Sequence, residues 1–398
     1  MIEHTGLETD RSRLAGGAED RSVDEVQLLE KIDLLAAEII SRAGEAETDR
    51  HLPSSIMAEL GAAGLYRATV PKSHGGLELP LPIIVRILER LSKLDGSLGW
   101  ISHVRFLAPL GLALLPRERF DAIMSGGPDI VGAAVTQPTG TAEATDGGWR
   151  ITGRWPFASG FDDADIVALH CVVTEGGDPL PSTRLIYAPT RDLQREDSWH
   201  ALGLKATASH HIVANNVMVN AADAIDLATA RSSLPGPLYS GIFQISTLFH
   251  CPMALGVAQA AVDDLVDLAQ GGRRQFGAAT QLKDSETFLF ELGKAQAALR
   301  AAQAFTDTEA RRIWEQAQAG VLSSGLPEAK ILQSAIWVTQ TCLQVVQSCF
   351  SLAGGAAVYS TSSLQRRLRD IQTMAQHVNV HHRHYVEAGR ALIQTQGV

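Results

Sequence analysis

The sequence has few cysteines and no excess of positive charge. Its four cysteines, at positions 171, 251, 342 and 349, are too scattered for a disulfide framework, and no CxxC or Cys/His zinc spacing occurs. Lys and Arg number 34 against 44 Asp and Glu, a formal net charge of −10. Nucleic acids and anionic membranes need clustered positive charge, so neither is an expected partner. The first 20 residues lack the apolar core of a secretory signal, and we expect a soluble, cytoplasmic protein.

Several catalytic motifs are also missing. The sequence contains no Walker A loop, no HExxH helix and no GxSxG elbow, which weakens the nucleotidase, metalloprotease and hydrolase hypotheses. The glycines of GGWRITGRWPFASG lie among strand-forming residues and do not open a helix as a dinucleotide-binding GxGxxG does. Hydrophobic residues make up 45% of the chain and charged residues 20%, enough for a substantial core.

Hydrophobic periodicity divides the chain into helices, then strands, then helices. Short β-rich runs between turn clusters predict a small antiparallel barrel or sandwich in the middle. Four long helical patterns then predict an antiparallel bundle, with helices near 239–270, 284–319, 327–353 and 363–393. The expected parts are a flexible tail (1–21), an N-terminal α-helical domain (22–127), a middle β domain (128–235) and a C-terminal four-helix bundle (236–398).

Histidines are the candidate chemical groups that stand out by type. His377, His381 and His384 fall at i, i+4 and i+7 and would share one face of the last predicted helix. A metal site there is conceivable, but no carboxylate or Cys is spaced to complete a ligand set, so we expect no metal. His103 follows an apolar stretch, and a satisfied core or surface histidine is slightly favoured over a ligand.

Five short motifs occur in one order along the chain. Thr136-Gln137-Pro138 is similar to a T-E-P segment, and the stretch from 147 to 160 is similar to a glycine turn, a strand and a W-I-T-N segment. Residues 273–277 match R-x-Q-F-G, and a glycine pair and an R-D pair follow at 354–355 and 369–370. Together they resemble the acyl-CoA dehydrogenase superfamily, which implies a mainly α fold with a central β domain and a C-terminal four-helix bundle.

The resemblance implies a flavin site. Thr136 would lie against the flavin, Phe157 would take the aromatic position, and Ser159 would hydrogen-bond flavin N5. Arg273 and Phe276 would hold the pyrophosphate and adenosine of an FAD bound to a neighbouring subunit. The glycine pair would complete the cofactor-binding residues, which are then Thr136, Phe157, Ser159, Arg273, Phe276, Gly354 and Gly355.

The catalytic glutamate of the dehydrogenases is missing. Counted from Arg369-Asp370, its position falls on Val378, next to His377, and residues 239–259, which would hold the alternative glutamate, contain no acidic residue. Gln137 replaces the glutamate of T-E-P. Abstraction of an α-proton from an acyl thioester needs a base, so ordinary acyl-CoA dehydrogenation is disfavoured.

Another branch of the superfamily fits these departures. Residues 95–100 resemble a G-S-x-G-W segment, and W-x-F-x-S-G at 155–160 and His377 before Tyr385-x-Glu-Ala-Gly-Arg look like the flavin-dependent monooxygenases of two-component systems. This resemblance implies reduced FAD (FADH2) or FMN (FMNH2) from a separate NAD(P)H:flavin reductase, O2 as co-substrate, a C4a-hydroperoxyflavin, and hydroxylation of a small aromatic or polycyclic molecule. It also implies a homotetramer, a dimer of dimers.

In this interpretation Ser159 and His377 are the catalytic residues. Ser159 would stabilise the flavin adduct through N5, and His377 would hydrogen-bond the distal peroxide oxygen or take a proton from the substrate. An apolar substrate cavity would be lined by Trp100, His103, Phe106, Phe243 and Phe249.

Two alternatives stay open. The first is an atypical acyl-CoA dehydrogenase or oxidase-like FAD enzyme with a non-standard base, which substrate alone would reduce without oxygen. The second is a flavin-free binding module, which would never retain a flavin.

Overall fold

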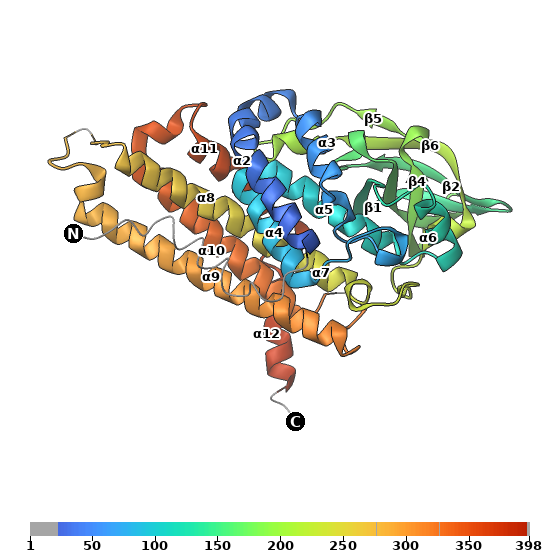
Figure 1. Ribbon diagram of the computed structural model, residues 1–398. Coiled ribbons are helices and arrows are strands. Elements are labelled where there is room, and N and C mark those ends of the chain that lie inside the picture. The colour runs from blue at the N-terminus through green and yellow to red at the C-terminus, as the bar shows by residue number, and fades with distance from the viewer. Residues whose placement is uncertain (1–22, 276, 326, 396–398) are drawn as a thin grey trace.

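The computed structural model describes residues 23–395 except 276 and 326 (Figure 1). The predicted flexible tail (1–21) and Phe276 lie outside the described residues. The predicted mainly α fold with a central sheet is confirmed: helices occupy both ends of the chain and strands its middle. In Figure 1 the sheet lies at one end of an elongated molecule and the long helices extend away from it.

Prolines and one aspartate set where the N-terminal helices begin. Pro53, Pro80 and Pro116 precede three of them, as expected for a residue that presets φ and lacks an N–H. Asp95 caps the helix that begins at Gly96, because its side chain accepts a hydrogen bond from the Leu98 N–H at 3.0 Å. The helices are α2 (Val23–Asp49), α3 (Ser54–Ala62), α4 (Leu81–Leu94), α5 (Gly96–Leu112) and α6 (Arg117–Met124).

The middle strands form one seven-stranded sheet in the order β5-β6-β2-β1-β3-β4-β7. The prediction of an entirely antiparallel barrel or sandwich is wrong in one respect, since β1 and β3 pair in parallel. The chain leaves β2, passes through residues 156–165 and enters β3 on the far side of β1, so β3 runs with β1. The strands are β1 (Gly132–Thr145), β2 (Gly148–Trp155), β3 (Ile166–Glu175), β4 (Asp178–Pro189), β5 (Gln194–Glu196), β6 (His211–Asn220) and β7 (Ala224–Ile225).

The C-terminal helices are shorter than predicted at two places. The predicted helix 239–270 divides at Phe249, and the predicted helix 363–393 stops at Met374. His377 then has extended backbone angles, and its Nδ1 accepts the Asn379 N–H at 3.2 Å, so its side chain caps a short 3-10 turn. The prediction that His377, His381 and His384 share one helix face is therefore wrong. The helices are α7 (Ile242–Leu248), α8 (His250–Gln270), α9 (Glu286–Gln318), α10 (Ala329–Ala353), α11 (Ser363–Met374) and α12 (His384–Thr395).

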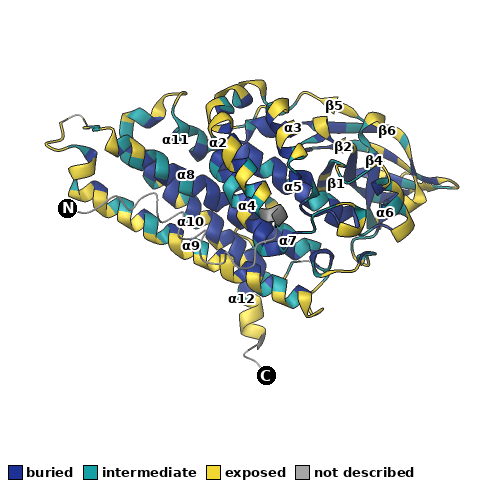
Figure 2. Cartoon of the chain, viewed as in Figure 1, coloured by how far each residue is buried: buried dark blue, intermediate teal, exposed yellow. Residues whose placement is uncertain are grey.

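Helix α8 is the buried centre of the molecule (Figure 2). The stretches 242–270 and 329–358 are each long and apolar enough to cross a membrane by length and composition. In the first, 89% of the apolar window is buried inside the molecule, as in a core helix, whereas 33% is buried in the second. Helix α4 packs directly on α8 at Gly256, where a Cβ atom would lie 2.3 Å from the Glu89 carbonyl oxygen.

We expect Gly256→Ala to destabilise the protein by about 1–3 kcal/mol, because the added methyl group would push two packed helix backbones apart. The measurement is the melting temperature or denaturant midpoint. Gly293→Ala is the matched control: Gly293 lies within α9, is exposed, and has nothing within 4 Å of its would-be Cβ. That control should stabilise the protein by about 0.5–1 kcal/mol. Equal effects of the two substitutions would contradict the close approach.

Candidate active site

Four aromatic rings from three parts of the chain meet beside the sheet. Trp100 lies at the centre, with ring centroids 5.6 Å from His103, 5.8 Å from His250 and 5.6 Å from His377. The His250 and His377 rings are 4.4 Å apart with an interplanar angle of 34°. His103 and His250 are 5.6 Å apart. We call Trp100, His103, His250 and His377 the imidazole cluster.

Each member of the cluster is placed by local structure. Trp100 and His103 are three residues apart on α5, so they share one helix face. His250 begins α8 directly after the break at Phe249. His377 is the cap of the turn between α11 and α12. The two breaks in the predicted helices, at Phe249 and after Met374, thus position His250 and His377.

A hydrogen-bonded chain of hydroxyls joins the cluster to the β domain. The Trp100 indole N–H donates to Ser159 Oγ at 3.1 Å, and Ser159 Oγ lies 2.6 Å from Ser209 Oγ. Ser209 Oγ lies 2.7 Å from Thr207 Oγ1, which donates to the Leu204 carbonyl at 2.8 Å. The Thr207 hydroxyl donates its one hydrogen to the Leu204 carbonyl. Ser209 must therefore donate to Thr207, and Ser159 must donate to Ser209. Ser159 Oγ keeps one free lone pair, and the Ser159 N–H bonds to the Phe157 carbonyl at 2.9 Å.

Burial makes the three imidazoles poor bases. Desolvation lowers the pKa of His103 to about 3 and the pKa of His377 to about 4. Desolvation, with smaller contributions from His377 and His103, also lowers the pKa of His250 well below its usual range. Within the described part of the chain no carboxylate pairs with any of the three rings, and no group of three His, Cys, Asp or Glu is arranged to hold a metal ion. The cluster is neutral at physiological pH.

Several polar atoms of the cluster are left without a partner. Both ring nitrogens of His103 and Nε2 of His250 are buried and bond to no atom of the residues that the structure describes. A buried polar atom without a partner costs about 1–3 kcal/mol. Such atoms are frequent where a ligand or an ordered water completes the site.

One buried carboxylate lies near the cluster and serves the fold. Asp370, on α11, accepts the Leu204 N–H at 2.7 Å and faces Gly96 at the start of α5. Desolvation, with the negative charge of Asp95, raises the pKa of Asp370 to about 7. Its hydrogen bond holds the loop that carries Thr207 and Ser209 against the bundle.

The predicted flavin-facing residues of the β domain lie on its surface beside the cluster. Phe157 has a left-handed φ of 64°, and its exposed ring meets Trp199 edge-on at 6.2 Å between centroids. A bulky residue rarely adopts this conformation, and such strain is typical of ligand sites. Thr136 is exposed in the irregular stretch of β1 between Val135 and Gly140, and its carbonyl contacts His170 Nδ1 at 2.7 Å.

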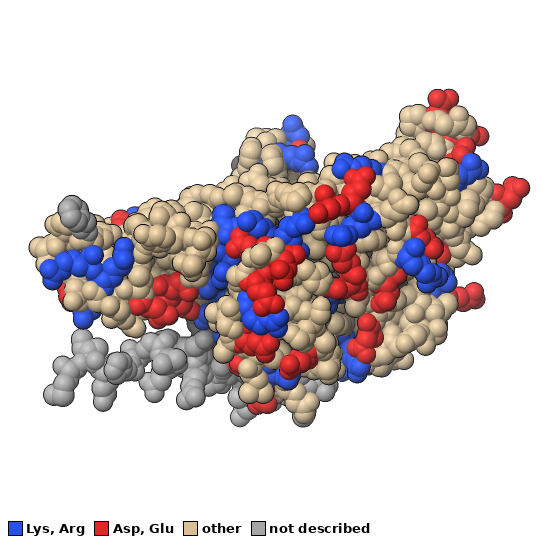
Figure 3. Space-filling view, turned by 90° about the horizontal axis from the view of Figure 1, so that it is seen from above, with Lys and Arg blue, Asp and Glu red and all other residues tan. Residues whose placement is uncertain are grey.

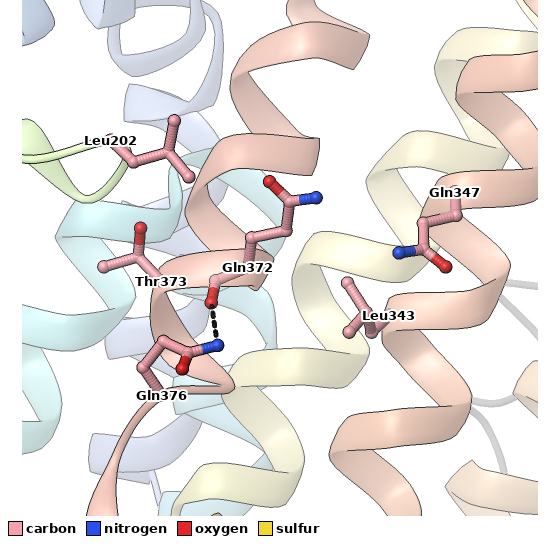
Figure 4. A pocket seen from close by; sticks show the side chains of 6 residues that line it. All are labelled: Leu202, Leu343, Gln347, Gln372, Thr373 and Gln376. Carbon is pink, nitrogen blue, oxygen red and sulfur yellow. Dashed lines mark hydrogen bonds between the residues drawn. The ribbon is translucent and has the colours of Figure 1, made fainter.

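A cavity of about 520 Å³ opens between α10, α11 and the loop after Trp199 (Figure 4). Three of its lining residues are glutamines, whose amides both donate and accept hydrogen bonds. Gln376, one of the lining residues, comes directly before His377 in the sequence. The lining residues are Leu202, Leu343, Gln347, Gln372, Thr373 and Gln376.

A second group of predicted cofactor residues lies at the other end of the bundle. Gln275, in the connection between α8 and α9, donates to the Leu352 carbonyl at 3.1 Å, which brings Arg273 close to Gly354 and Gly355. Arg273 Nε is buried without a partner among the described residues, and Gly354 has a φ of 60° that favours glycine. Helix α8 has 21 residues and is therefore about 30 Å long. Its length separates this group from His250, so one chain does not bring Arg273 to Ser159.

The predicted substrate residues divide between the cluster and the core. Phe249 contacts the His103 ring at 6.1 Å between centroids, and Trp100 and His103 belong to the cluster. Phe106 is fully buried in the core, and Phe243 lies on α7, partly exposed. His250 was not predicted. The signal in the sequence is a single histidine in the apolar run FHCPMALG. This run lies within residues 239–259, which contain no acidic residue.

Known proteins share this fold and sequence. The acyl-CoA dehydrogenase N-terminal domain family matches residues 24–112 and the C-terminal domain family matches residues 248–382. An indole-3-acetate monooxygenase of Pseudomonas putida is 32% identical over 350 residues, covering 88% of this chain and 89% of its own. The oxygenase component of an FADH2-dependent resorcinol hydroxylase from Rhizobium sp. (strain MTP-10005) is 25% identical over 374 residues, covering 89% and 91%. The structure of XiaF from Streptomyces sp. in complex with FADH2 and glycerol is 25% identical, with a TM-score of 0.87 and 98% of both chains covered.

The fold and these relatives define a flavin-dependent oxidoreductase, as the sequence predicted. The chain belongs to the acyl-CoA dehydrogenase family, and the relatives named above are monooxygenases of that family's fold.

We expect stability to fall as the pH drops below 6.5. Unfolded His103 takes up a proton near its ordinary pKa of 6.5, whereas the folded ring stays neutral down to about pH 3, so acid favours the unfolded chain. One pH unit in this window corresponds to about 1.4 kcal/mol for one such group. His103→Leu should therefore reduce the drop in melting temperature between about pH 7.5 and 5.5, measured by calorimetry.

His200→Gln is the control for that experiment, because the His200 side chain is 69% exposed. Its melting temperature should follow the wild-type pH profile. An unchanged profile in His103→Leu would mean that the folded His103 ring takes up a proton as readily as the unfolded one.

Proposed function

We propose that the protein is the oxygenase component of a two-component flavin monooxygenase that hydroxylates a small aromatic substrate with O2. The observation that carries the proposal is the imidazole cluster: three neutral histidines beside Ser159, with no carboxylate paired to any of the three rings among the described residues. Dehydrogenation of a thioester needs a base of sufficient strength. Oxygen transfer to an electron-rich ring needs hydrogen-bond donors and the exclusion of water.

The residues of the β domain fit a flavin. Reduced flavin, when bound, supplies the two electrons that allow one oxygen atom to enter the substrate and the other to leave as water. Ser159 Oγ is already a donor to Ser209 and an acceptor from Trp100, so its remaining lone pair would accept the N5 hydrogen of the reduced ring. The glutamine amides of the cavity between α10 and α11 would match the alternating N–H and C=O groups of the flavin's pyrimidine edge. Phe157 would offer its exposed ring to the flavin.

His377 would act as a hydrogen-bond donor to the oxygen being transferred. Its Nδ1 accepts the Asn379 N–H, so the neutral ring carries its hydrogen on Nε2. Of the two roles that the sequence left open, donation and proton abstraction, this tautomer favours donation. The low pKa of about 4 favours the same choice, since a neutral ring with this pKa holds an added proton weakly.

Two further partners belong to the proposal. A separate NAD(P)H:flavin reductase would supply the reduced flavin, as the two-component relatives imply. A second copy of this chain would complete the FAD site, because Arg273 and Gly354 lie about 30 Å from the cluster in one chain, by the length of α8. Helix α12 extends from the body with exposed Val386, Leu392 and Ile393, an apolar face suited to the predicted homotetramer (Figures 1 and 2).

We also propose FAD in preference to FMN, and a cytoplasmic location. Arg273 has a buried Nε without a partner among the described residues, and this atom would pair with a phosphate of the pyrophosphate, which FMN lacks. The four cysteines are free and buried, as suits a reducing compartment. Acidic and basic side chains are mixed on the face seen in Figure 3, as is usual for a protein surface that faces water.

The decisive experiment is mass spectrometry after reaction with ¹⁸O2. Protein supplied with chemically reduced FAD and indole-3-acetate or resorcinol should add one ¹⁸O atom to the aromatic product. Omitting the reduced flavin should abolish the product. Anaerobic reduction of protein-bound oxidised FAD by an acyl-CoA thioester, with no ¹⁸O product, would instead establish the dehydrogenase alternative.

His377→Ala tests the donor role in the same assay. We expect flavin binding within about twofold of wild type, and hydrogen peroxide in place of most of the oxygenated product, because a lost charge-neutral donor costs about 1 kcal/mol or more at the reacting oxygen. Val378→Ala is the neighbouring control, since the Val378 side chain is 47% exposed. Unchanged coupling in His377→Ala would remove His377 from the mechanism.

Arg273→Ala tests the choice of cofactor. It should weaken FAD binding by about 10- to 100-fold, because a charge-assisted hydrogen bond to phosphate is lost, and should leave FMN binding nearly unchanged. Dissociation constants from fluorescence titration measure both. Arg274→Ala, at the exposed neighbouring position, is the control and should change neither. Equal losses for FAD and FMN would contradict the pyrophosphate contact.

A further inference from the structure

His250 is the member of the cluster that the proposed mechanism leaves without a role. Its ring contacts all three others, at 4.4 Å from His377, 5.6 Å from His103 and 5.8 Å from Trp100. The residue is 3% exposed, and its Nε2 has no partner among the residues described. A central, buried ring with an open nitrogen is therefore available to whatever molecule enters the cluster.

The neighbouring groups leave this nitrogen a defined task. The Trp100 N–H donates to Ser159, and His377 Nδ1 accepts the Asn379 N–H. The neutral His377 ring therefore carries its hydrogen on Nε2, which can act as a donor. The His250 and His377 rings are tilted by 34° with their centroids 4.4 Å apart, and His250 Nε2 has no partner among the described residues. With a donor already present at His377, an acceptor at His250 Nε2 would complement it, and the ring hydrogen of His250 would then lie on Nδ1.

We propose that His250 Nε2 accepts a hydrogen bond from an N–H or O–H group carried on the aromatic ring of the substrate, and so selects substrates with such a ring-borne donor. The inference rests on the proposed function and names its substrate class. A site with a buried acceptor strongly rejects an analogue that lacks the donor, because the acceptor then stays unpaired. His250 would position the ring beside His377.

The electrostatics of the cluster agree with a neutral donor. The groups that face His250 are the two imidazoles, the Trp100 ring and, through His103, the Phe249 ring, and none of them carries a charge at neutral pH. Neutral rings offer no countercharge to an anion at this point. They match a polar hydrogen on an otherwise apolar ring, as in an indole or a phenol.

Binding of indole and 1-methylindole, measured by titration calorimetry, tests the assignment. The two probes differ in one ring-borne N–H. Wild-type protein should bind indole about tenfold more tightly, the value of one buried hydrogen bond. His250→Leu should bind both probes equally, and His250→Gln, whose amide oxygen is again an acceptor, should restore part of the preference. Circular dichroism and the melting temperature check that each variant is folded.

Three results would overturn the assignment: equal wild-type affinity for the two probes, binding of neither probe, or a preference that persists in His250→Leu, which would show that the methyl group is excluded by shape alone. The oxygenation assay is independent of this one. Incorporation of ¹⁸O without a preference for indole would leave the monooxygenase function standing and remove the role of His250. A preference for indole that depends on His250, without ¹⁸O in any product, would support the role of His250 and reject the proposed function.

Discussion

The hydrogen bond from the Trp100 indole to Ser159 is the interaction on which the site depends. It joins the N-terminal helices to the β domain, and the same indole ring makes T-shaped contacts with imidazoles from α8 and from the turn after α11. Three segments distant in sequence are thereby held around one side chain. The hydroxyl chain through Ser209 and Thr207 extends this connection to the loop that Asp370 fixes to the bundle. The orientation of the Ser159 hydroxyl therefore depends on how the N-terminal helices, the β domain and the bundle pack together.

The site contains buried polar atoms without partners among the described residues and a strained backbone conformation, which do not stabilise the fold. Both nitrogens of His103 and Nε2 of His250 are buried without partners among the described residues, and Phe157 is held in a left-handed conformation. Each of these costs stability. The surrounding structure over-determines them: α4 and α8 touch at Gly256, and Asp370 anchors the loop beside the cluster. A rigid, preorganised environment of this kind is what hydrogen bonding to a transient oxygen species requires.

The sequence predicted the fold well where the signal was periodic. The ranges of α9 and α10 agree with the predicted helices to within two residues, because long amphipathic patterns define them. It failed where one side chain ends a helix. The helical pattern of residues 363–393 predicts a helix that includes His377. In the structure the helix ends at Met374, and His377 Nδ1 caps the short turn that follows. The parallel pairing of β1 with β3 depends on the path of residues 156–165, which no local pattern encodes.

The sequence predicted several residues of the site but not the contacts between them. Ser159, Trp100 and His377 follow from motifs, but the contacts among them are tertiary, and no motif includes His250. That omission is instructive, because the search in residues 239–259 was for a carboxylate, the base of the dehydrogenases. A neutral imidazole on the same helix does different chemistry: it can orient a polar hydrogen and cannot retain a proton at neutral pH once it is desolvated. In the proposed oxygenase, buried imidazoles in place of a carboxylate would therefore hold an aromatic ring in position instead of removing a proton from the substrate.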